Sequence, residues 1–208
     1  MINVSIAGIG GQGSVLAARI LAQAAEAKGW QVRSAETIGM AQRGGDVMSH
    51  VRMGNAGEEV FSPLPAKGTV DVLIALEPGE AARALPYLKE NGLLVVASTG
   101  IPPVMANFKR QTYDPQHLID DMQAAGVKMV VVDDAELVHR LGEPKALNVM
   151  MLAYAIIAVN KREDCVDNAL RGATTLEDIE AAIPLCVKRK LVSVNEKAIK
   201  VVQQVARV

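Results

Sequence analysis

Four glycines in six residues, placed between an apolar run and a helix-like stretch, constrain this chain more than any other segment. The apolar run covers residues 4–7 and the glycine segment is Gly8–Gly13. A glycine inside a regular element costs roughly 0.5–1 kcal/mol relative to alanine, so a cluster of glycines indicates a sharp turn or the close approach of a ligand or partner. A strand, a glycine turn and a helix N-terminus also leave backbone N–H groups at the positive end of the helix dipole. The segment therefore predicts a site for an anion, most often a phosphate.

The glycine segment matches the dinucleotide pattern Gly-x-Gly-x-x-Gly, with the required strand before it and helix after it. Glu36 ends the next predicted strand and could hold a ribose hydroxyl. Against this interpretation, no helix follows that strand, and no His, Tyr–Lys or Cys constellation for hydride chemistry is present. NAD(P) binding and a tight turn without a ligand both stay open at this point. The residues expected to approach a ligand or partner here are Gly8, Gly10, Gly11, Gln12 and Gly13.

Hydrophobic periodicity predicts an α/β chain. Strands are expected over 2–8, 31–36, 47–53, 70–76, 92–97 and 128–132, and helices over 14–28, 78–84, 115–125, 134–141, 146–159, 175–182 and 187–205. A β-hairpin is expected from 47–53 through the turn 54–57 to a short return strand, 59–61, and residues 104–113 could form another short strand. Pro184 is expected to interrupt the helical region. The predicted architecture is one domain, 1–208, with three α/β/α layers, a mostly parallel sheet, a hairpin insertion and a helical C-terminal region.

A polar, glycine-bearing loop, 37–46, stands where a doubly wound fold would place its second helix. It contains Gln42, Arg43 and Gly44, followed by another glycine. An arginine flanked in this way can present its guanidinium to a carboxylate or phosphate. The alternative is a solvated loop arginine. We expect this loop to lie near the first glycine segment and to share its ligand or partner.

Composition excludes several classes of function. The net charge of −1 implies no basic face, so no nucleic-acid partner is expected, and no run approaches the roughly 20 apolar residues of a membrane span. The two cysteines, Cys165 and Cys186, form no Cys-x-x-Cys pair. They predict reduced thiols in a cytoplasm and no iron–sulfur or four-cysteine zinc site in this chain. No metal-ligand spacing occurs, and His50, in a predicted strand, is more typical of a packed residue than of a catalyst.

Together the two loops resemble those of the γ-type subunit of 2-oxoacid:ferredoxin oxidoreductases, and within that family the indolepyruvate type. The matching segments span most of the chain. They are 8–13, 36–45, 49–52, 62–63, 71–78 and 145–148, with Asn195 in the final helix. The resemblance implies a reaction in which a 2-oxoacid is decarboxylated on thiamine diphosphate, electrons pass through iron–sulfur clusters to ferredoxin, and an acyl-CoA is released.

The same resemblance implies that this chain works only with others. Thiamine diphosphate and [4Fe-4S] clusters are expected in a larger partner subunit, in a heterodimer or heterotetramer that delivers electrons to ferredoxin. This chain would hold none of these cofactors alone and would complete the coenzyme A or substrate side of a shared site. The residues that this role implies are the two glycine-bearing loops: Gly8, Gly10, Gly11, Gln12, Gly13, Gln42, Arg43 and Gly44. The catalytic residues are unknown, and a stand-alone NAD(P)-binding oxidoreductase or a non-enzymatic binding protein remains the alternative.

Overall fold

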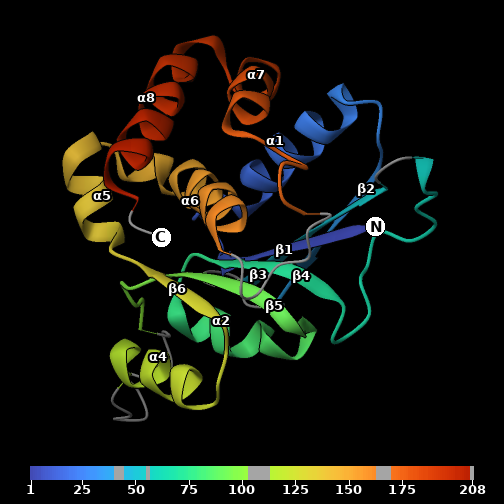
Figure 1. Ribbon diagram of the computed structural model, residues 1–208. Helices are drawn as coiled ribbons and strands as arrows, with labels where there is room; N and C mark the ends of the chain where they lie inside the picture. Colours follow the sequence, from blue (N-terminus) through green and yellow to red (C-terminus); the bar gives the residue numbers. More distant parts are fainter. Residues whose placement is uncertain (40–44, 55–56, 103–112, 163–169, 207–208) are drawn as a thin grey trace.

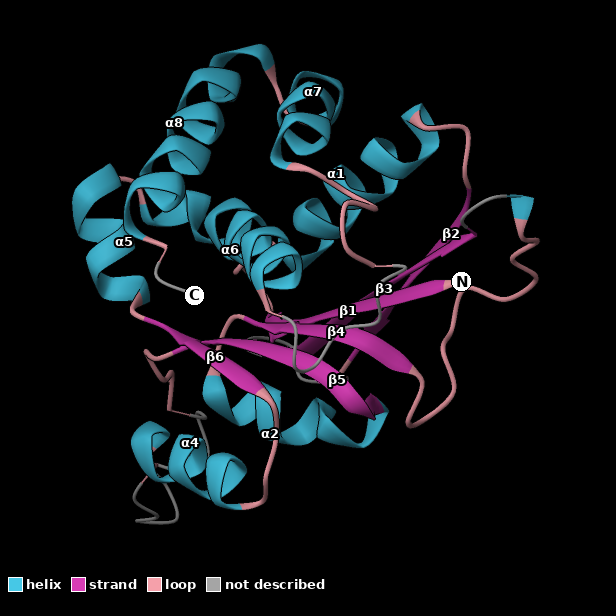
Figure 2. Ribbon diagram, viewed as in Figure 1, coloured by secondary structure: helices cyan, strands magenta, loops and turns pink. Residues whose placement is uncertain are grey.

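A six-stranded mixed sheet forms the centre of the protein (Figures 1 and 2). The computed structural model describes residues 1–39, 45–54, 57–102, 113–162 and 170–206. The strand order is β2-β3-β1-β4-β5-β6. The strands are β1 (Ile2–Ile9), β2 (Gln31–Ile38), β3 (Asp46–Gly54), β4 (Val70–Ala75), β5 (Leu88–Ala97) and β6 (Met129–Val132). β1, β4, β5 and β6 are mutually parallel, whereas β3 pairs antiparallel with both β1 and β2.

Helices cover both faces of this sheet, which confirms the predicted three-layer α/β/α architecture (Figure 1). One face carries α1 (Ser14–Ala27), α5 (Asp134–Leu141), α6 (Leu147–Lys161), α7 (Leu176–Cys186) and α8 (Arg189–Val205). The other face carries α2 (Pro78–Ala84) and α4 (Pro115–Ala124). A short 3-10 turn, Leu85–Tyr87, follows α2, and another, Pro144–Ala146, leads into α6 on the first face. Alternate strand residues supply the two cores, Ile2, Val4 and Ile6 on the α1 side and Ala7, Leu73 and Ala75 on the α2 side.

The hairpin of the structure differs from the predicted one. Residues 59–61 form no strand, so the expected return strand after 47–53 is wrong. Instead β3 pairs with the preceding β2 along its whole length, from Gln31 opposite Gly54 to Ile38 opposite Val47. β3 therefore inserts between β1 and β2, and the loop 39–45 becomes the hairpin connection.

Polar side chains begin most of the helices where the sequence predicts. Asp114, Asp133 and Thr175 each accept a hydrogen bond from a first-turn N–H group of the helix that follows. The prediction for Pro184 is wrong, because α7 continues through it to Cys186. A proline near a helix end removes only one internal hydrogen bond, and the flanking Ile183 is fully buried in the core, which offsets that loss.

Candidate functional site

The candidate site lies at the edge of the sheet where β1 and β4 end. These neighbouring strands are parallel, but β1 leads to α1 on one face and β4 leads to α2 on the opposite face (Figure 1). Such a reversal between adjacent parallel strands is the position at which open α/β sheets bind ligands. The glycine segment occupies this position, immediately after β1.

Two of the glycines are required by packing inside the chain itself. A side chain at Gly8 would meet the Gln12 amide oxygen at 2.9 Å and Leu76 at 3.1 Å. At Gly13 it would meet the Asn148 amide nitrogen at 2.6 Å, and the backbone of Gly13 is left-handed, with φ 83°. These two positions therefore need no ligand to explain the absence of a side chain.

The two exposed glycines of the segment differ from each other. Gly11 has φ +103°, a conformation that disfavours any side chain, although nothing lies within 4 Å of where its Cβ would be. Gly10 has no such φ, and a Cβ there would meet only the Gly45 carbonyl oxygen at 3.6 Å and Val47 at 3.9 Å. Neither its backbone conformation nor its packing against the described residues demands glycine at position 10. The bare backbone of Gly10 is the feature of the segment that contacts among the described residues do not explain.

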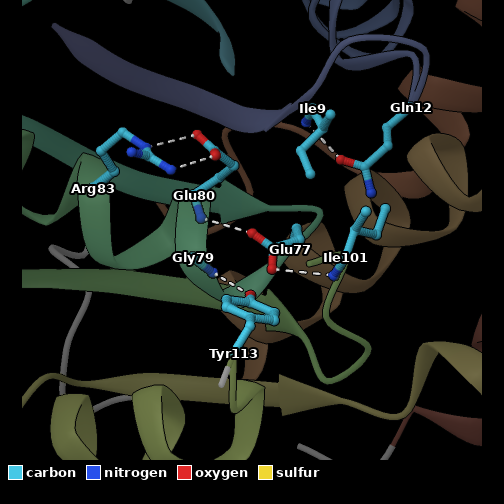
Figure 3. Close-up of polar contacts among 8 residues, drawn as sticks. All are labelled: Ile9, Gln12, Glu77, Gly79, Glu80, Arg83, Ile101 and Tyr113. Atoms are coloured by element: carbon cyan, nitrogen blue, oxygen red, sulfur yellow. Dashed lines mark hydrogen bonds and ion pairs between the residues drawn. The ribbon is translucent and has the colours of Figure 1, made fainter. Parts of the chain in front are cut away.

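Gln12 braces the ends of β1 and β4. Its amide oxygen accepts a hydrogen bond from the Ile9 N–H at 2.6 Å, and its amide nitrogen donates to the Leu76 carbonyl at 2.9 Å. Figure 3 shows the first of these contacts. Because both ends of the side chain are bonded to the backbone, Gln12 shapes the turn, and the surface that the segment presents is its backbone.

α1 begins without a side-chain cap. The N-cap residue, Gly13, has no side chain that could cap the helix, and the first turn holds no acidic residue. The first N–H groups of a helix have no partners within the helix, so this end suits an anion. Asn148, in the first turn of α6, donates to the Gly13 carbonyl at 2.9 Å and fixes the position of this end. The Asn148 amide oxygen has no hydrogen-bond partner among the described residues, although the residue is 2% exposed.

A buried carboxyl group, Glu77, stands at the end of β4 (Figure 3). One of its oxygens accepts from the Glu80 N–H at 2.9 Å and caps α2, and the other accepts from the Ile101 N–H at 3.3 Å. Burial raises the pKa of Glu77, and the hydrogen bonds that it accepts partly oppose that effect. The Gly79 N–H donates to the Tyr113 hydroxyl at 3.1 Å. Glu77 thus links the first turn of α2 to the segment after β5.

Asp134 holds the same segment from the other face of the sheet. Its carboxylate accepts from the Ser98 hydroxyl at 3.1 Å and from the Thr99 N–H at 2.8 Å. Glu77 directly precedes the helix predicted over 78–84, and Asp134 is the first residue of the helix predicted over 134–141; neither was predicted as a site residue. The available signal was their position, since each acidic residue follows a buried parallel strand directly or within two residues.

The second loop meets the first at its base. The Gly10 N–H donates to the Gly45 carbonyl at 2.9 Å, and the Gly39 N–H donates to the Asp46 carbonyl at 2.8 Å. This contact confirms that the 37–46 loop lies near the glycine segment. Gln42, Arg43 and Gly44 lie outside the described residues, so their predicted contacts with a ligand or partner stay predictions.

His50 is packed inside the protein. It is 2% exposed, shares a 2.8 Å hydrogen bond with the Ser5 hydroxyl and lies against the Tyr87 ring at 5.8 Å between centroids. Burial lowers the pKa of His50. Among the described residues, no group of three or more His, Cys, Asp or Glu side chains could hold a metal ion. No helix in the described part of the chain is both long enough and apolar enough to cross a membrane.

Comparison with known proteins identifies the family. The family model described as pyruvate ferredoxin/flavodoxin oxidoreductase matches residues 3–207. The chain belongs to this family. One relative, the indolepyruvate oxidoreductase subunit IorB of Archaeoglobus fulgidus, is 33% identical over 204 residues, which cover 96% of this chain and 92% of the relative. The resemblance seen in the sequence is therefore confirmed at the level of the oxidoreductase family.

Solved structures of the pyruvate ferredoxin/flavodoxin oxidoreductase type share this fold. The γ subunit of a keto/oxoacid ferredoxin oxidoreductase from Geobacter sulfurreducens PCA superposes with a TM-score of 0.66 at 22% identity, covering 98% of this chain and 97% of that one. A 2-oxoglutarate:ferredoxin oxidoreductase from Magnetococcus marinus, solved with 2-oxoglutarate, coenzyme A and succinyl-CoA, also gives 0.66 at 16% identity. The match covers 99% of this chain and 31% of that longer chain.

The strand order separates this family member from a dinucleotide-binding fold. Glu36 is level with Ile6 of β1, but Ser49 of β3 lies between them. Two strand spacings, about 9.6 Å, therefore separate Glu36 from the strand that precedes the glycine segment, instead of one. In the dinucleotide fold the ribose-binding acid ends the strand that directly neighbours the first. The geometry that gives this acid its role is absent among the described strands.

Proposed function

We propose that this chain is the small, γ-type subunit of a 2-oxoacid:ferredoxin oxidoreductase of the indolepyruvate type and completes the coenzyme A side of a site shared with a larger subunit. The observation that carries the proposal is Gly10, an exposed glycine that neither its own backbone nor its packing against the described residues requires. It lies where β1 and β4 diverge, beside the uncapped end of α1. A group from outside the chain that approaches within contact distance explains why no side chain is present there.

The donors at this position fit a phosphate group. The first turn of α1 contains no acidic residue and no side-chain cap, so its backbone N–H groups are available to an anion, and the helix dipole favours negative charge there. Coenzyme A carries phosphates and supplies the thiol that accepts the acyl group. Arg43 of the second loop is proposed to add a positive charge, with Gln42 and Gly44 beside it. The Magnetococcus marinus enzyme, whose longer chain includes this fold, was solved with coenzyme A and succinyl-CoA, which supports this ligand class.

The electron path is proposed to lie outside this chain. The sequence contains two cysteines, fewer than the four thiolates of a [4Fe-4S] cluster. The larger subunit would therefore carry the thiamine diphosphate and the clusters and would pass electrons to ferredoxin. Within this chain, Gln12, Asn148 and Glu77 hold the turn, the start of α1 and the segment after β5 in place. Their proposed role is to present a fixed surface to the coenzyme and the partner.

Reconstitution tests this function. The chain is purified alone and also co-expressed with the thiamine- and cluster-bearing subunit, and reduction of ferredoxin is followed with indolepyruvate, phenylpyruvate, pyruvate and 2-oxoglutarate in the presence of coenzyme A. We expect activity in the complex only, with the aryl pyruvates preferred. Oxidation of a 2-oxoacid by the isolated chain would refute the proposal. Binding of NADH by the isolated chain, followed by nicotinamide fluorescence, would favour the dinucleotide alternative.

A further inference from the structure

A polar groove runs along the outer side of α1, on the opposite side of the helix from its buried face. The groove encloses about 430 Å³ between α1 and β2. α1 contributes the exposed Val15, Arg19 and Glu26 and the half-buried Ala22 and Gln23, and β2 contributes Ser34 and Glu36. The groove is distinct from the glycine segment and plays no part in the proposed function.

β2 itself is an open edge. It ends the sheet, and none of the described residues pairs with its outer side. Its eight residues contain no proline, lysine or bulge, three features with which proteins block a free edge, and its two charges, Arg33 and Glu36, have opposite signs. Ile38, its last residue, is 68% exposed. An edge of this kind is a template for another strand.

We propose that β2 and α1 form the interface through which two copies of this chain associate about a twofold axis. The axis passes beside Ala35, perpendicular to the sheet, and joins the two β2 strands antiparallel into one continuous sheet. In that register Val32 of one copy lies opposite Ile38 of the other, and Ser34 lies opposite Glu36. The exposed Ile38 gains an apolar neighbour, and no like charges are placed directly opposite each other.

The helices match the same axis. Ile38 is level with Gly8 through Val47, at the edge where α1 begins. Ala35 lies three residues back from this edge, about 10 Å at 3.3 Å per residue. Ala22 lies eight residues into α1, about 12 Å at 1.5 Å per residue. Ala35 of β2 and Ala22 of α1 therefore lie at nearly the same distance from this edge, so one twofold axis can pass beside both.

Charge complementarity across the axis supports the arrangement. α1 contacts both β2 and β3, so the two α1 helices lie about 10–14 Å apart across the axis. The helices run antiparallel about a point between Ala22 and Gln23, which places Arg19 of one copy opposite Glu26 of the other, twice by symmetry. Small Ala22 at the centre permits close approach. The interface is smaller than the 20–30 residues a side of a standard stable complex, so the dimer forms reversibly, in the micromolar range.

Sedimentation velocity of the full chain over a micromolar concentration series tests the proposal directly. We expect a concentration-dependent monomer–dimer equilibrium. The variant R19E brings carboxylates together at both symmetry-related contacts and should weaken the dimer about tenfold. The charge-swapped double variant R19E/E26R should restore it. Both side chains are exposed, so circular dichroism should show unchanged folding. A chain that stays monomeric at every concentration, or a dimer unaffected by R19E, overturns the proposal.

Disulfide trapping checks the register. In a C165S/C186S background, A35C places two thiols beside the axis and should crosslink on oxidation. R33C is the matched control, because its two thiols are about 13 Å apart along the strands and should not crosslink. Crosslinking of the control but not of A35C overturns the register. These tests need no partner subunit, so their failure leaves the proposed enzymatic role untouched.

Discussion

Replacing Gly10 by alanine adds one methyl group at the centre of the candidate site. Among the described residues, the nearest atoms to this methyl are the Gly45 carbonyl oxygen at 3.6 Å and Val47 at 3.9 Å, which are ordinary contacts. The backbone of Gly10 lies outside the left-handed region, and its N–H bond to Gly45 is unchanged. A glycine-to-alanine change at such a position stabilises a protein by about 0.4–1 kcal/mol, because the unfolded chain loses freedom. In a domain of this size the Tm should rise by about 1–4 °C.

Gly10→Ala should raise the Tm but lower the activity of the reconstituted complex at limiting coenzyme A. If coenzyme A or the partner contacts the Gly10 backbone, the methyl group occupies that contact. We expect KM for coenzyme A in the reconstituted complex to rise at least about tenfold, equivalent to about 1.4 kcal/mol, with KM for the 2-oxoacid little changed. The assay compares initial rates of ferredoxin reduction at varied coenzyme A with calorimetric melts of the isolated subunit.

Gly13→Ala is the matched control for folding. Its methyl group would lie 2.6 Å from the Asn148 amide nitrogen on a backbone with φ +83°, so a loss of at least about 1–2 kcal/mol of stability is expected. Full activity of Gly10→Ala at unchanged coenzyme A affinity would refute the reasoning, since it would show that nothing approaches this backbone. A lower Tm for Gly10→Ala would show instead that the local geometry differs.

Three further changes test the supporting structure. Gln12→Ala removes two hydrogen bonds between the strand ends and should cost about 1–3 kcal/mol in urea unfolding, whereas an unchanged midpoint would contradict the bracing role. Burial lowers the pKa of His50 below 6.5, so its contribution to stability is complete above pH 6.5 and is lost as the pH falls through the lower folded-state pKa. Unfolding midpoints at pH 7.5 and 5.5 should therefore differ less in His50→Gln than in the wild type, and equal differences would count against this. Pro184→Ala restores one helical N–H near the end of α7 and should raise stability by about 1 kcal/mol, the net contribution of one hydrogen bond, whereas a lower melting temperature would contradict the proline's cost.

Local patterns predicted most of the fold because they arise from short-range chemistry. Buried strands such as β4 have apolar residues on both faces, and acidic residues such as Asp114 mark helix starts by accepting backbone N–H groups. Which strands pair with each other was harder to predict. β3 could pair with the strand predicted after it or with β2 before it. Turn-like residues such as Gly54 and Gly57 follow β3 in either case, so the local sequence does not decide between them.

The candidate site was predicted only in part, for a physical reason. Glycines stand out in a sequence because they are costly, but their individual causes differ. Gly8 and Gly13 face Gln12 and Asn148, and those contacts appear only when the ends of β1, β4 and α6 meet. Sequence spacing brings none of these elements together. The glycine pattern indicated the candidate site, and only the packing distinguished Gly10, whose Cβ would make ordinary contacts with the described residues, from Gly8 and Gly13.

The inserted strand explains why the sequence resembles a dinucleotide fingerprint while the fold serves another role. A Gly-x-Gly-x-x-Gly turn requires only a strand, a sharp turn and a helix start, and this chain supplies all three. Recognition of NAD in the dinucleotide fold also uses the acid of the neighbouring strand, and β3 moves Glu36 one strand further away. The same insertion brings Gly45 into hydrogen-bond contact with Gly10. The β2–β3 hairpin therefore removes the ribose partner and, in the same step, places a second glycine-bearing loop against the first.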